Sequence, residues 1–227
     1  MTPFLFLGFV VLMAVVVCAL VARYRGPRDA AFVAVALVPW LLYVGVLGYG
    51  GVIRNTAMRP PGAVFLFAPV VLFLLVFLWR ARASVALAFP LWLLLGTQTF
   101  RVGGEWFLHR LLIEGLIPKM LTFAGANVDI YIGASAPLAA WLATRGPTGK
   151  GLALGWNVLG LLALANVVIR AIGTAPGPLN LLHAETPNRM IGTFPYMFIP
   201  GFFVPLALVL HILALKALNA RARAAAN

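Results

Sequence analysis

The sequence predicts an all-α membrane protein, a polytopic bundle of helices, on two observations of composition and one of pattern. Of its 227 residues, 63% are hydrophobic and 10% are charged, and the mean hydropathy is +1.02. A water-soluble domain carries about 25% charged residues and about 45–50% apolar ones. The apolar residues also form runs of about 20, the length that crosses a bilayer core as a helix. These observations exclude a water-soluble globular domain and a disordered chain.

Seven apolar runs follow one another along the chain. They cover residues 3–22, 30–50, 63–79, 84–100, 127–143, 151–172 and 195–218. Segments rich in arginine, proline and glycine separate them, as at 23–28, 54–62 and 174–192. The sequence therefore predicts seven transmembrane helices within one transmembrane helical domain over residues 1–227.

A further short helix is predicted at residues 102–116, either re-entrant or lying at the membrane interface. Continuing the fourth span to residue 116 would give a helix about 50 Å long at 1.5 Å per residue, which is too long for one crossing. Gly103 and Gly104 offer a point at which the chain can bend between the two helices.

The basic residues predict the orientation. Ten lie after the first, third and fifth spans and in the tail: Arg23, Arg25, Arg28, Arg80, Arg82, Arg145, Lys150, Lys216, Arg221 and Arg223. Because an excess of Lys and Arg marks the cytoplasmic side, we expect the N-terminus outside and the C-terminus in the cytoplasm of a multi-pass protein of the inner (plasma) membrane. The basic residues are dispersed between apolar runs, so the expected partner is the lipid bilayer and not a nucleic acid.

Ionisable residues at membrane depth are costly and indicate function by default. Arg101, Glu105 and His109 follow at intervals of four and would share one face of a helix. Asn127 and Asp129 begin the fifth span at the same outer level. With Asn166 and Arg170, near the outer end of the sixth span, they predict a polar pocket on the extracytoplasmic side.

Two expectations concern individual residues of this outer region. A buried Arg170 would need a carboxylate, and Asp129 or Glu105 is the expected partner. His211 lies 16 residues into the seventh span, about 24 Å from its outer end at helical rise, so it is expected to be a core histidine far from the outer polar residues.

The pocket favours an integral membrane protein that binds or transports a small polar or anionic ligand or an ion. Arg101 and Arg170 would fix the anionic group, and Glu105, His109 and Asp129 would supply acceptors and a titratable site. The predicted ligand-binding set is Arg101, Glu105, His109, Asn127, Asp129, Asn166 and Arg170. The sequence identifies no cofactor and assigns no catalytic residue.

The alternative is a membrane-embedded, hydrolase-like metal enzyme. Glu105 and His109 would present two ligand types on one helical face, and His183 and Glu185 in the last outer loop could complete a zinc site of nitrogen and oxygen ligands.

The sequence between Phe100 and Ile130, together with Phe194-Pro-Tyr and Val204-Pro-Leu followed by His211, resembles uncharacterised small bacterial polytopic membrane proteins. The resemblance covers about the second half of the chain. No activity is assigned to that group, so the resemblance implies only that this segment characterises it.

Overall fold

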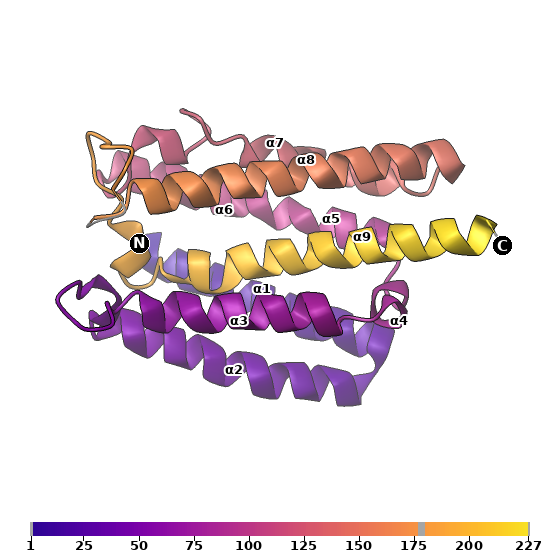
Figure 1. Ribbon diagram of the computed structural model, residues 1–227, viewed down its shortest axis with the longest axis horizontal. Coiled ribbons are helices and arrows are strands. Elements are labelled where there is room, and N and C mark those ends of the chain that lie inside the picture. The colour runs from indigo at the N-terminus through magenta and orange to yellow at the C-terminus, as the bar shows by residue number, and fades with distance from the viewer. Residues whose placement is uncertain (1, 177–179, 227) are drawn as a thin grey trace.

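The computed structural model describes residues 2–176 and 180–226, and within these ranges all regular structure is helical (Figure 1). The helices, most of which run along one long axis, are α1 (Thr2–Arg25), α2 (Pro27–Tyr49), α3 (Val64–Arg80), α4 (Ala83–Leu87), α5 (Leu91–Gly96), α6 (Phe100–Ile113), α7 (Asp129–Leu142), α8 (Gly146–Gly173) and α9 (Val204–Ala226). Short 3-10 turns lie at Val52–Arg54, Thr97–Thr99, Lys119–Leu121 and Met190–Gly192, and a π-helical turn, Ile199–Phe203, leads into α9.

Four helical stretches of the described chain are long and apolar enough to cross a membrane: Thr2–Arg25, Pro27–Tyr49, Gly146–Gly173 and Ile199–Ala224. Large apolar side chains cover their outer faces, as with Phe4, which is 80% exposed, and Phe32, which is 76% exposed. Such surfaces are tolerated in lipid and not in water. The expectation of an all-α fold is therefore confirmed, and the four long apolar helices fit a membrane protein.

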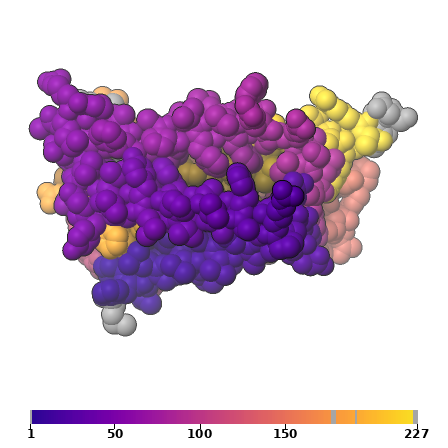
Figure 2. Space-filling model, turned by 90° about the horizontal axis from the view of Figure 1, so that it is seen from below, coloured from indigo at the N-terminus to yellow at the C-terminus, as the bar shows by residue number. Residues whose placement is uncertain are grey.

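The central element of the bundle is α9. In the most apolar window of the stretch Ile199–Ala224, which joins the π-helical turn to α9, 61% of the residues are buried, against 17% in α1 and 11% in α2. Seen from below, α9 is visible at the bottom of a hollow between α2 and α3 (Figure 2). The segment around α9 thus supplies the surface on which the outer helices pack.

The segment from residue 83 to 113 differs from the prediction of a span at 84–100 followed by a separate helix at 102–116. The helix α4 ends at Leu87, Pro90 stands directly before α5, and one 3-10 turn joins α5 to α6. Figure 1 shows α5 and α6 following one another along the long axis. The break comes at Pro90, which has no N–H to donate, and the Gly103-Gly104 pair lies inside α6 without ending it.

Two glycines allow the helices around the polar residues to approach closely. A Cβ on Gly133 of α7 would lie 2.8 Å from the backbone nitrogen of Val102 in α6. A Cβ on Gly160 of α8 would lie 2.4 Å from Cε1 of His211 in α9. Small residues at such crossings are typical of membrane helix packing, and here they bring α6, α7, α8 and α9 together around Arg101.

Candidate functional site

Arg101 is the centre of a buried polar cluster. It lies in the first turn of α6 and is only 4% exposed. Its Nε donates to Oδ2 of Asp129 at 2.8 Å, and its Nη2 donates to Oδ1 of the same carboxylate. This two-point contact is the strongest geometry for an arginine and a carboxylate, and it fixes α6 against α7.

Asp129 is held in place by the chain that leads into its helix. It is the first residue of α7, where the helix dipole favours a negative charge. Its backbone N–H donates to Oδ1 of Asn127 at 2.9 Å, which orients the turn before the helix. The amide of Asn127 also donates to the carbonyl of Leu121 at 3.0 Å.

His211 on α9 accepts a hydrogen bond from Arg101. Arg101 Nη1 lies 2.9 Å from His211 Nε2, and His211 Nδ1 lies 2.8 Å from Oδ1 of Asn157 on α8. Because a guanidinium only donates, Nε2 must be the acceptor and the ring proton must be on Nδ1, which donates to Asn157. Nδ2 of Asn157 donates a hydrogen bond to the backbone carbonyl of His211 at 3.2 Å. The histidine is therefore held as one neutral tautomer.

Glu105, one turn after Arg101, is the member of the cluster with unused bonding capacity. It is 2% exposed, and its Oε1 accepts from Nδ2 of Asn127 at 2.6 Å. Its Oε2 is buried and has no hydrogen-bond partner among the described residues. The backbone of Phe123 faces the carboxyl group but makes no hydrogen bond to Oε2. A buried acceptor without a donor is costly and calls for an explanation.

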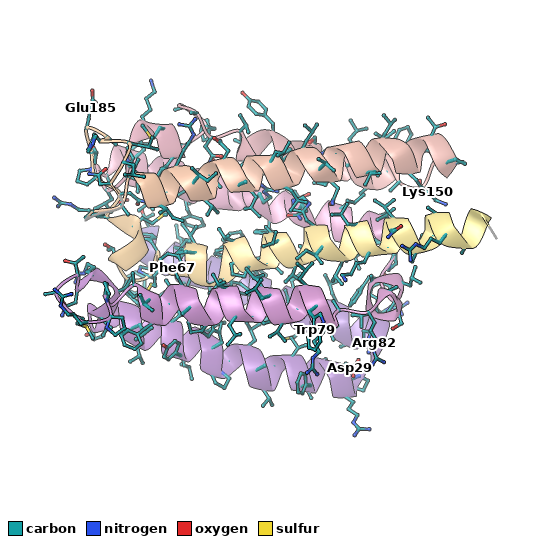
Figure 3. The ribbon with its side chains drawn as sticks, in the orientation of Figure 1. Asp29, Phe67, Trp79, Arg82, Lys150 and Glu185 are labelled. Carbon is teal, nitrogen blue, oxygen red and sulfur yellow. The ribbon has the colours of Figure 1, made fainter. Side chains whose placement is uncertain are left out.

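A cavity of about 520 Å³ lies against this cluster. Its walls come from α3, α6, α8, α9, the first residue of α7 and neighbouring turns, and they are apolar except at Arg101, Glu105 and Asp129. Such a volume falls in the range of small-molecule sites. Phe67, which lines the cavity from α3, is labelled in Figure 3.

The cavity reaches the outer surface of the bundle between α3 and α8. Val71 of α3 and Ile172 of α8 both line it, and they are 51% and 37% exposed. Both are apolar, as a surface in contact with lipid requires. The cavity is therefore bordered at this surface by apolar side chains of α3 and α8.

Of the seven ligand-binding residues predicted from the sequence, the structure brings four together: Arg101, Glu105, Asn127 and Asp129. The ring of His109, one turn beyond Glu105, packs against Phe123 with 4.8 Å between ring centroids and does not join the cluster.

The expected pairing of Arg170 with Asp129 or Glu105 is wrong. Arg170 Nε donates to Oδ1 of Asn166 at 2.8 Å, and Asn166 donates to the carbonyl of Ala126 at 2.9 Å. Arg101 already occupies both oxygens of Asp129, so that carboxylate is not available to α8. Asn166 and Arg170 therefore anchor α8 to the turn before α7.

The expectation that His211 lies far from the outer polar residues is also wrong, although the expectation of a buried core histidine holds, since it is 0% exposed. The depths expected for His211 and for Arg101 along the bundle are both wrong. The chain forms turns before the π-helical turn at Ile199, so the span begins later than residue 195, and Arg101 lies midway between Leu91 and Ile113. The consequence is that the sequence analysis missed His211 and Asn157 as members of the cluster.

The alternative metal site is not assembled. Among the residues that the structure describes, no three His, Cys, Asp or Glu side chains gather where they could hold a metal ion. His183 and Glu185 are exposed in the loop between α8 and α9, whereas Glu105 is buried with Asn127. The ligands proposed from these two segments do not converge.

The fold and the cluster define an all-helical protein with four helices apolar enough to cross a membrane, a buried ion pair and an adjoining apolar cavity. The chain belongs to the family described as Domain of unknown function (DUF8737), whose model matches residues 60–219. This match contains every residue that lines the cavity and the six residues of the cluster, which are Arg101, Glu105, Asn127, Asp129, Asn157 and His211. No curated protein and no solved structure matches the chain.

Proposed function

We propose that this protein is an integral membrane protein that binds or transports a small molecule with an apolar body and one polar group. The proposal rests on the carboxyl group of Glu105. Its Oε2 is a buried acceptor without a donor, in a residue that lines an otherwise apolar cavity of about 520 Å³. The terminal torsion of a glutamate is soft, so the carboxyl group can turn this oxygen toward a ligand.

The same geometry argues against an anionic ligand. Arg101 is the one cation among the described residues that line the cavity, and it donates to Asp129, to His211 and, at 3.4 Å, to the carbonyl of Gly160. An anion would have to displace Asp129, which would leave that carboxylate buried without its partner. The polar group of the ligand therefore meets Glu105 as a hydrogen-bond donor or as a cation.

A seven-crossing topology is part of the proposal. The stretches α3, α5–α6 and α7 would complete the crossings between the four long helices, since residues 91–113 alone span about 35 Å at 1.5 Å per residue. Arg82 and Lys150 lie at one end of the bundle and Glu185 at the other (Figure 3). The protein would lie in the inner membrane. Its basic end would face the cytoplasm, and its N-terminus would lie outside.

Filling the cavity tests the proposal. Gly104 lines it, and a Cβ there meets no atom within 4 Å, so Gly104→Leu can occupy the cavity without disturbing the backbone. Native mass spectrometry of the wild type should show one small molecule retained per chain, and Gly104→Leu should lose it. Gly155→Leu on the exposed face of α8, where a Cβ also meets nothing, is the matched control and should retain it. Retention of the same adduct by Gly104→Leu would refute the proposal.

A further inference from the structure

The buried charges of the cluster do not balance. Arg101 and Asp129 neutralise one another, and Glu105 adds a second carboxyl group for which no cation is present among the residues around it. His211 on α9 cannot serve, because its Nε2 lone pair is used by Arg101 and its proton by Asn157.

Among the residues that the structure describes, the elements packed around Glu105 place no other charged group in contact with it. The cavity residues of α3 and α8 are all apolar, and Arg170 farther along α8 is bonded to Asn166. Lys119, the first residue of the turn that accepts a hydrogen bond from Asn127, is exposed. His109 on α6 packs against Phe123, and its buried Nδ1 makes no hydrogen bond to Glu105 or to any other described residue. An anionic Glu105 would be an unpaired buried charge, which costs several kcal/mol in an apolar environment.

We infer that the cavity takes a lipophilic monocation in exchange for one proton. The inference rests on the proposed function and names its ligand class. In the empty cavity Glu105 carries its proton as a neutral carboxylic acid. When the cation enters, the O–H bond breaks, the proton leaves to solvent, and the carboxylate pairs with the cation. The charge of the cavity is the same before and after the exchange, so neither state contains an uncompensated charge.

The walls and the opening fit this class of ligand. A lipophilic cation presents mostly apolar surface, which the side chains of α3, α8 and α9 would cover. It also concentrates in the membrane, where the opening beside Val71 and Ile172 would admit it. A small inorganic cation would leave most of the 520 Å³ unfilled and would lose its hydration without gaining ligands beyond one carboxylate.

Two ions of the same shape and opposite charge test the inference. Wild-type protein in nanodiscs of zwitterionic lipid is titrated with tetraphenylphosphonium and with tetraphenylborate, and proton release is followed with an indicator in weak buffer. We expect saturable binding of one phosphonium per chain with release of one proton. The affinity should fall about tenfold per pH unit on the acidic side, since one proton competes with one cation. Tetraphenylborate should not saturate the site.

Glu105→Gln keeps an acceptor for Asn127 and removes the charge. It should weaken phosphonium binding about a hundredfold, as for loss of one partner of a desolvated pair, and should abolish proton release. Glu185→Gln, at an exposed carboxylate, is the control and should behave as wild type. The midpoint of thermal unfolding verifies that both variants are folded.

Three results would overturn the inference: phosphonium binding without proton release, equal binding of the borate, or unchanged binding by Glu105→Gln. Titration with the neutral analogue tetraphenylmethane distinguishes failure of the cation inference from failure of the proposed function. If it or the borate saturates a site that Gly104→Leu blocks, the cavity binds ligands and only the cation assignment is wrong. If neither ion nor the neutral analogue binds and no adduct is retained, both proposals fail.

Discussion

A guanidinium that is 4% exposed inside a membrane protein is tolerated only where acceptors surround it. Arg101 meets this condition with groups from three other helices: the carboxylate of Asp129, the ring of His211 and the carbonyl of Gly160. The two halves of the ion pair therefore depend on each other.

This dependence predicts strong coupling in a double-mutant cycle. Arg101→Met and Asp129→Asn should each lower the free energy of unfolding by about 3–5 kcal/mol, because each leaves one charge buried alone. The double variant should lose clearly less than the sum, since neither charge remains. Denaturant titration of the four proteins in one detergent measures the cycle. Losses that simply add would show that the contact does not carry the stability assigned to it.

Residue type and spacing were sufficient to find Arg101, Glu105, Asn127 and Asp129, because polar groups in long apolar runs are rare and the helical period of α6 relates the first two. They were not sufficient for His211. Whether His211 reaches Arg101 depends on the residue at which the helix of each begins. Those starting residues follow from helix breaks that hydropathy alone does not locate. Proline supplied the signal: Pro90 marks the true start of the stretch that carries Arg101.

At the scale of helices, the position of the cluster depends on contacts made by glycine. Gly160 places the backbone of α8 against the ring of His211, which hydrogen bonds hold on both of its nitrogens. The ring therefore cannot move aside without breaking one of these bonds.

Gly160→Ala should accordingly destabilise the protein, although alanine is the better helix former. The added Cβ would lie 2.4 Å from Cε1 of His211, and overpacking of this kind costs about 1–3 kcal/mol. Gly155→Ala, five residues earlier on an open face of the same helix, should leave the stability equal or slightly higher. Thermal unfolding of both variants in the same detergent makes the comparison. Equal midpoints would show that α8 and α9 can separate at this crossing without cost.

At the scale of the whole molecule, orientation decides which compartment the cluster serves. The cavity adjoins the half of the bundle that holds Phe67, and Glu185 lies toward that same end, whereas Arg82 and Lys150 lie at the other end (Figure 3). If the basic end is cytoplasmic, a proton released at Glu105 and a cation taken from the membrane both belong to the outer half.

Cysteine labelling tests this orientation, because Cys18 is the only cysteine in the sequence. In a Cys18→Ser background, Glu185→Cys should react with a membrane-impermeant maleimide in intact cells. Lys150→Cys, at an exposed position of the opposite end, should react only after the cells are permeabilised. The reverse pattern would place the cavity in the cytoplasmic half. A proton exchanged there would come from the cytoplasm. The end of the bundle with more basic residues would then lie outside, against the usual excess of Lys and Arg on the cytoplasmic side.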